Sequence, residues 1–374
     1  SALSDICKHS PELAQAVVDA GAVAYLAPLI VHPDAKLKRQ VCSCLAQIAK
    51  HSVDLAEVIV EAEIFPNVLN CLKDTDPFVR KNAATCIREV AKHTPELAKL
   101  IVNSGGAAAL VDYVSEAQGN GKLPGIMAIG YIAAFSETLA LAIIVSKGVA
   151  PLKEALVTEP EDHIKAASAW SLGQIGRHTS DHARALAEGD VLRHLLACMV
   201  HQDSSEDLKT KSKRALKAIL AKCTHLQALQ PLLREAPVKV QKYVLKQFAS
   251  ILNIIVSFIG IGTLIAGIIG ISNIMVFVVK ERTKELGIRK ALGATPKNII
   301  SIILQESIFI TTLSGYFGLV IAFAILKIIG NKLQEDYWIT NPSIETENAI
   351  LATVLLIFFG TIAGYIPAKK AANI

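Results

Sequence analysis

The chain has 374 residues, 52% of them hydrophobic, and a formal net charge of +5 at pH 7. The length allows two or more domains, and the charge balance does not indicate a nucleic-acid-binding protein. Residues 1–249 carry 28 Lys/Arg and 26 Asp/Glu, whereas residues 250–374 carry only ten and seven. This drop in the number of charged residues predicts two domains, over residues 1–249 and 250–374, with the boundary near Ser250.

The seven cysteines all lie in the first of these domains, at helical spacings inside apolar runs. This pattern favours small buried residues in a reducing compartment over a metal or redox site. Residues 1–11 lack the apolar core of a secretory signal peptide, so we expect no cleaved leader there.

An internal repeat of 42 residues runs through the first domain. The phrase at residues 5–14 recurs at 47–56 and at 89–98, and fainter copies begin at Tyr131, Gln174 and Ala218. This period is typical of armadillo and HEAT units of two or three helices. Ser/Thr-Pro-Glu phrases predict hydroxyl-capped helix starts, and stacked units bury a continuous core. The predicted fold is all-α, a right-handed armadillo-type superhelical solenoid.

Two positions recur with the repeat. His9, His51 and His93 lie 42 residues apart, and we interpret them as structural residues at helix ends. The other position lies on the third helix of each unit, where polar side chains predict a row of hydrogen-bonding groups facing an extended partner. A solvated helix face is the alternative, and Trp170 fits either this groove or a packing role. The candidate groove residues are Gln47, Glu89, Tyr131, Trp170 and Gln174.

Several phrases carry a resemblance to a known family: PELAQ at 11–15, KHSVDLAE at 50–57, LPGIM at 123–127 and EPEDHIKAA at 159–167. They resemble the armadillo proteins of the ciliary central apparatus, up to about Phe248. The resemblance implies a non-catalytic scaffold of cytoplasmic or axonemal type. It also implies axonemal or microtubule-associated proteins as partners.

The second domain contains three long uncharged runs. Ser250 to Val279 is the longest, and the others cover 307–326 and 349–368. About 20 apolar residues suffice to cross a bilayer as a helix. We therefore predict three transmembrane helices, at about 251–279, 303–329 and 349–368, and a multi-pass membrane location for the whole chain.

The loop between the first two spans reads KERTKELGIRKALGATP at 280–296. It resembles the FtsX-type permease domain of MacB-like ABC transporters, over about 251–374. The resemblance implies an amphipathic cytoplasmic helix that docks on a separate ATPase subunit. Leu286 and Ile288 would offer apolar contact; the alternative is a basic loop that only fixes topology. The candidate coupling residues are Glu281, Arg282, Glu285, Arg289 and Lys290.

Lys/Arg-rich flanks place the 280–297 loop and the C-terminus in the cytoplasm, which puts residues 1–249 outside. A signal-less solenoid of cytosolic type conflicts with that side, and the alternative, a cytosolic solenoid, inverts the charge rule. We therefore hypothesise an artificial join of a eukaryotic axonemal fragment and a bacterial permease tail. No nucleotide, metal or catalytic pattern stands out, so no enzyme and no cofactor is predicted. The leading function is a protein-binding scaffold with a permease-like tail; the alternative is a permease subunit that exports a lipid or peptide.

Overall fold

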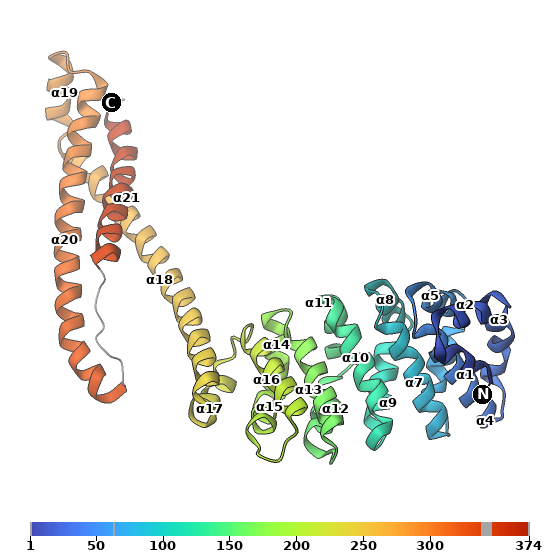
Figure 1. The fold of residues 1–374 in the computed structure, drawn as a ribbon. Helices are drawn as coiled ribbons and strands as arrows, with labels where there is room; N and C mark the ends of the chain where they lie inside the picture. The colour runs from blue at the N-terminus through green and yellow to red at the C-terminus, as the bar shows by residue number, and fades with distance from the viewer. Residues whose placement is uncertain (1, 63, 338–345, 373–374) are drawn as a thin grey trace. The chain divides into compact units, whose positions relative to one another are not determined.

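The computed structural model of the chain describes residues 2–62, 64–337 and 346–372. It divides into two compact units, Ser1–Ile251 and Leu252–Ile374. All regular structure within the described residues is helical (Figure 1). The all-α prediction is therefore confirmed for this part of the chain.

The first unit, called unit 1 below, consists of short helices of 3–15 residues that follow one another as stacked repeats. These are α1 (Ala2–His9), α2 (Pro11–Asp19), α3 (Ala22–Leu26), η1 (Ala27–Val31), α4 (Ala35–Ala49), α5 (Val53–Glu61), α6 (Phe65–Cys71), α7 (Pro77–Ala91), α8 (Pro95–Asn103), α9 (Gly106–Glu116), η2 (Gly119–Gly121), α10 (Leu123–Phe135), α11 (Glu137–Val145), α12 (Val149–Thr158), α13 (Asp162–Gly176), α14 (Ser180–Glu188), α15 (Val191–Val200), α16 (Glu206–Leu220) and α17 (Leu226–Glu235). The long helix α18 (Val238–Glu281) begins in this unit.

Local sequence explains where the repeat helices begin. A Ser or Thr side chain caps α2, α5, α8, α11 and α14, and each accepts a hydrogen bond from the backbone N–H three residues on. Proline follows the cap at Pro11 and Pro95, where its missing N–H costs nothing. Gly21 and Gly105 have φ of 77° and 81° and separate that helix from the next, a conformation that glycine adopts readily. The predicted hydroxyl caps are confirmed.

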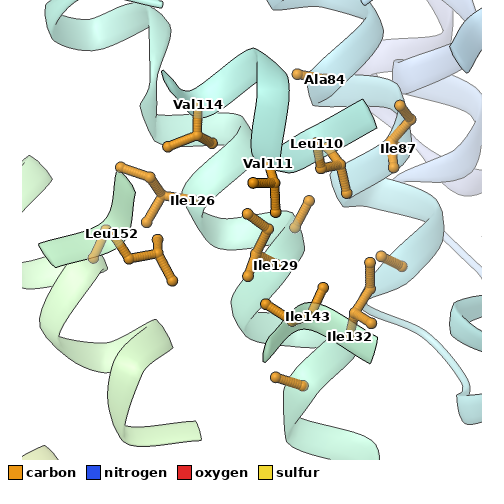
Figure 2. Close-up of a cluster of buried hydrophobic side chains, with 14 of the residues drawn as sticks. Ala84, Ile87, Leu110, Val111, Val114, Ile126, Ile129, Ile132, Ile143 and Leu152 are labelled. Atoms are coloured by element: carbon orange, nitrogen blue, oxygen red, sulfur yellow. The ribbon is translucent and has the colours of Figure 1, made fainter. Parts of the chain in front are cut away.

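The helices α1, α4, α7, α10, α13 and α16, called the third helices below, pack each against the next along unit 1. Behind them one continuous apolar core runs through the repeats. Figure 2 shows part of it, where side chains from α7, α9, α10, α11 and α12 interdigitate, among them Ile87, Leu110, Ile129, Ile143 and Leu152. No repeat buries this surface alone, so stacking holds the solenoid together.

Ionic contacts add to this core where one repeat meets the next. Arg39 of α4 pairs with Asp76, the N-cap residue of α7. The hydrogen bond from Arg39 lowers the pKa of the Asp76 carboxyl to about 2. Lys122 and Glu159 form an ion pair of 3.0 Å in which both residues are buried. These pairs connect segments about 37 residues apart, and so tie neighbouring repeats.

The second unit, called unit 2 below, holds the rest of α18, α19 (Thr283–Ala291), α20 (Pro296–Tyr337) and α21 (Thr346–Ala372). Close approach of α20 and α21 depends on two glycines. Ser307 donates a hydrogen bond to the carbonyl of Gly360 at 3.1 Å, and a Cβ on Gly360 would lie 2.5 Å from Thr311. A Cβ on Gly364 would collide with Ser307. Small residues four apart thus form this helix seam, as in many membrane helix pairs.

Two described helices of this region are long and apolar enough to cross a membrane: Val240–Glu281 and Pro296–Ile325. They correspond to the first two predicted spans. The apolar part of α21, Ile350–Tyr365, is shorter than 18 residues, and residues 338–345 before α21 lie outside the described residues. Two bent helix pairs of unit 1 also pass the composition test. Their bends of 72° and 80° and their side chains in the repeat core fit a solenoid better than a span.

Candidate functional site

Gln47, Glu89, Tyr131 and Gln174 occupy equivalent places on successive third helices, and Trp170 lies about one turn before Gln174. Gln47 lies in α4, Glu89 in α7, Tyr131 in α10, and Trp170 and Gln174 in α13. Glu89 is buried, and the other four are half-buried. A half-buried row on stacked helices is what a lining surface requires, since its side chains are held by neighbours and still reach solvent.

Gln47 and Glu89 differ in how their polar atoms are satisfied. The Oε1 atom of Gln47 is buried and has no hydrogen-bond partner among the described residues. Glu89 accepts hydrogen bonds from Arg88 and Lys92. Burial alone would raise the pKa of the Glu89 carboxyl, but the bonds from Lys92 and Arg88 outweigh it and lower that pKa. Gln47 therefore holds a buried acceptor without a partner, whereas Glu89 is an ionised group whose charge is already matched.

Tyr131 and Trp170 form an aromatic pair between adjacent third helices. Their ring centroids are 5.1 Å apart with an interplanar angle of 69°, an edge-to-face arrangement. Trp170 also lies against Gly130, where an added Cβ would collide with the indole. The packing role considered for Trp170 is therefore present. Both rings are half-buried, so each keeps some exposed surface beside the groove residues, of which Gln174 is the next along the chain.

The recurring histidines connect repeats. Because backbone carbonyls only accept, His51 Nε2 donates to the carbonyl of Cys7 at 2.6 Å, and His93 Nε2 donates to that of Ala49 at 2.6 Å. His178 bonds the carbonyl of Ala133 at 2.7 Å in the same way. Each carbonyl lies near the C-terminal end of the preceding third helix, where carbonyls lack helical partners. Phe135 stands at this repeat position between His93 and His178. We call these bonds the histidine links.

The cysteines and metal-ligating groups form no reactive site within the described part of the chain. All seven cysteines are free, and six are buried. Burial raises the pKa of the Cys86 thiol to about 12, which disfavours the nucleophilic thiolate. No cluster of three or more His, Cys, Asp or Glu in residues 2–62, 64–337 and 346–372 has a geometry for a metal ion.

The predicted coupling residues surround helix α19 in unit 2. Glu281 ends α18 and is exposed. Arg282 pairs with Glu306 of α20 at 3.3 Å, which ties the start of α19 to that helix. Arg289 and Glu285 pair with each other at 2.8 Å on the helix surface, and Lys290 is exposed beside them.

The apolar residues of α19 divide between two roles. Leu286 is half-buried against a small cluster that includes Met275, Val279 and Ile303, so it helps to anchor the helix. Ile288 and Leu292 are 63% and 83% exposed. The expectation that Leu286 and Ile288 offer apolar contact stays a prediction, and of the two Ile288 exposes more of its side chain. Leu292, the residue that follows α19, adds exposed apolar surface that the sequence interpretation did not single out.

The fold and sequence together define an armadillo/HEAT-repeat solenoid followed by an FtsX-like permease domain. Residues 10–50 match the armadillo/beta-catenin-like repeat, 64–94 the HEAT repeat and 257–374 the FtsX-like permease C-terminal family. Sperm-associated antigen 6 of Homo sapiens is 62% identical over 101 residues, 27% of this chain and 20% of that protein. The macrolide export ATP-binding/permease protein MacB of Mannheimia succiniciproducens is 35% identical over 133 residues, 36% of this chain and 20% of that protein. Both predicted resemblances are confirmed, and the chain spans about a fifth of the length of these relatives.

Solved structures support the solenoid. An engineered protein aligns with a TM-score of 0.58 and 25% identity, over 67% of this chain and 62% of its own. A designed armadillo repeat protein in complex with the peptide (KR)4 aligns with a TM-score of 0.55 and 21% identity, over 58% and 90%. At these identities the second likeness establishes the fold alone.

The sequence interpretation did not identify one positively charged segment of unit 1. Averaged over residues 1–249, the charges nearly cancel, but residues 208–249 contain ten Lys/Arg and a single acid, Glu235. A running count of charge along the chain would have found it.

Proposed function

We propose that unit 1 is a non-catalytic scaffold of the ciliary central-apparatus type, whose third helices bind an extended polypeptide segment of an axonemal or microtubule-associated protein. The observation that carries the proposal is the row of half-buried groups on successive third helices, with the unsatisfied Oε1 of Gln47 within it. A buried acceptor without a partner costs free energy. Rotation of the half-buried Gln47 side chain toward solvent would present this oxygen to a backbone N–H of an extended ligand, which would supply the missing donor.

The similarity to human sperm-associated antigen 6 supports the axonemal partner class. The peptide bound by the designed armadillo protein supports an extended ligand. The Tyr131–Trp170 pair adds rigid aromatic surface, which loses little side-chain entropy when a ligand covers it.

Binding of the full chain, in detergent, to salt-washed axonemes tests the scaffold proposal. Replacing Gln47 and Gln174 by Ala, or Trp170 by Ala, should weaken binding about tenfold, as loss of central contacts does in other interfaces. Lys99→Ala and Leu100→Ala change exposed residues of α8 and serve as matched controls. Equal binding by groove and control variants, with unchanged helicity, would refute the groove assignment.

We further propose that the tail spans a membrane and that α19 contacts a separate ATPase subunit. The apolar, exposed Ile288 and Leu292 on a charged helix carry this second proposal, together with the FtsX-like match over 257–374. We expect an ATPase to bind α19 through these apolar side chains, because the buried centre of a protein interface is depleted in charged residues. The Arg289–Glu285 pair lies beside them on the helix surface.

Co-purification with the ATP-binding portion of a MacB-like protein tests the tail. Ile288→Asp with Leu292→Asp should abolish co-purification. Glu285→Ala with Arg289→Ala should reduce it less, because that pair is exposed and contributes little by itself. Ile254→Asn, on the exposed surface of α18, is the control. Retention of the ATPase by the double Asp variant would rule out α19 as the contact.

A further inference from the structure

The end of unit 1 carries a concentrated positive charge. Of the ten Lys/Arg in residues 208–249, Lys209 and Lys211 pair with acids of their own helix α16. Seven others are exposed and have no carboxylate partner among the described residues. Five of the seven lie on α16 or α18, and we name these the basic surface: Lys213, Arg214, Lys217, Lys242 and Lys246.

One contact unites the two helices that supply this surface. The ammonium of Lys217 in α16 lies 5.4 Å from the ring centroid of Tyr243 in α18. Lys213, Arg214 and Lys217 share one face of α16, and Lys242 and Lys246 share one face of α18, by their spacing of three and four residues. Lys217 therefore lies over the half-exposed Tyr243, and the other four cations stand within about one helical turn of one of these two residues. Repulsion among the cations of each helix favours an anionic occupant.

The course of α18 indicates which anion. Lys246 precedes Ser250, the first residue of the uncharged run, by four residues in the same helix. At about 1.5 Å per residue, Lys246 and Lys242 stand about 6 and 12 Å along the helix axis from that run. A headgroup layer is about 5–8 Å thick on each side of the hydrocarbon. Lys246 therefore falls within that layer, and Lys242 lies just outside it, where a long lysine side chain can still reach the headgroups.

We propose that the basic surface binds the anionic headgroups of lipids in the leaflet where α18 enters the membrane. The inference rests on the proposed membrane span of the tail. Each Lys or Arg near such a leaflet strengthens binding about fivefold. The five cations together thus hold the end of unit 1 at an acidic lipid surface, and the bond weakens as salt screens it.

Lysine modification in nanodiscs tests the proposal with the full chain. The chain is reconstituted in discs of phosphatidylcholine alone or with one third phosphatidylserine, and a water-soluble acetylating reagent is applied. Mass spectrometry reads the rate at each lysine. Lys213, Lys217, Lys242 and Lys246 should react about fivefold more slowly in the anionic discs. Lys73, Lys81 and Lys99, exposed elsewhere on unit 1, are the internal controls and should not change.

Two further arms separate the outcomes. Salt at 0.5 M should remove the protection, and Arg214→Gln with Lys217→Gln should reduce it at the remaining lysines; Lys81→Gln with Lys99→Gln should not. Equal rates in both discs would overturn the proposal, as would protection by added polyglutamate in neutral discs without protection by phosphatidylserine. A chain that does not enter neutral discs at all would instead refute the proposed membrane span.

Discussion

The histidine links allow a quantitative test of what holds neighbouring repeats together. His51→Ala leaves the carbonyl of Cys7 without its donor, and His93→Ala does the same at Ala49. A partly buried carbonyl that loses its only side-chain donor costs about 1–2 kcal/mol. His9→Ala is the matched control, because His9 is exposed and forms no hydrogen bond with another repeat in the part of the chain that the structure describes.

Native-state hydrogen exchange of the full chain in detergent reads the effect repeat by repeat. This assay is suitable because solenoid repeats open locally rather than in one transition. Amides of α4 and α5 in His51→Ala, and of α7 and α8 in His93→Ala, should exchange about five- to thirtyfold faster. His9→Ala should leave all rates unchanged. Equal effects of the three variants, or none at all, would refute the role of these bonds.

Four other outcomes follow from contacts described above. Lys122→Met should destabilise its repeat by about 3–5 kcal/mol in hydrogen exchange, since Glu159 stays buried and unpaired, whereas adding Glu159→Leu should restore most of the loss. The pKa of the Asp76 carboxyl is lower in the folded than in the unfolded chain. The stability that this carboxylate contributes, about 1–2 kcal/mol, is therefore complete above about pH 4 and lost toward pH 2. Asp76→Asn should remove that pH dependence in acid titrations. Gly360→Leu should separate α20 from α21 and accelerate exchange of both in nanodiscs, whereas Gly318→Leu, with open space around its Cα, should not. An artificial join predicts that transcripts diverge within codons 240–260; one continuous transcript from a single genome would end that hypothesis.

The repeat was readable from the sequence because its causes are local. A 42-residue period, hydroxyl caps and apolar spacing determine where helices begin and which side chains are buried, and the structure contains them at those places. The histidines at 51 and 93 were recognised as structural for the same reason, although their acceptors lie 44 residues away and only the fold shows them.

What could not be predicted depends on contacts between distant segments. Leu286 reads as a surface residue of a charged helix, yet it is half-buried against side chains of α18 and α20. Trp170 is placed against Gly130 by the packing of α13 on α10, which no local pattern encodes. The basic surface is different: its residues were visible, but a charge averaged over 249 residues concealed them.

Phe135 gives the solenoid a mechanical consequence. An imidazole joins α1 to the repeat of α4, α4 to that of α7, and α10 to that of α13, but the equivalent position after α10 holds a side chain that cannot donate to the end of α7. Under a load applied along the stack, the junction between α7 and α10 has one fewer tether than its neighbours. We expect it to yield before the junctions on either side of it, so that a stretched solenoid can part there into two pieces, each keeping its own links.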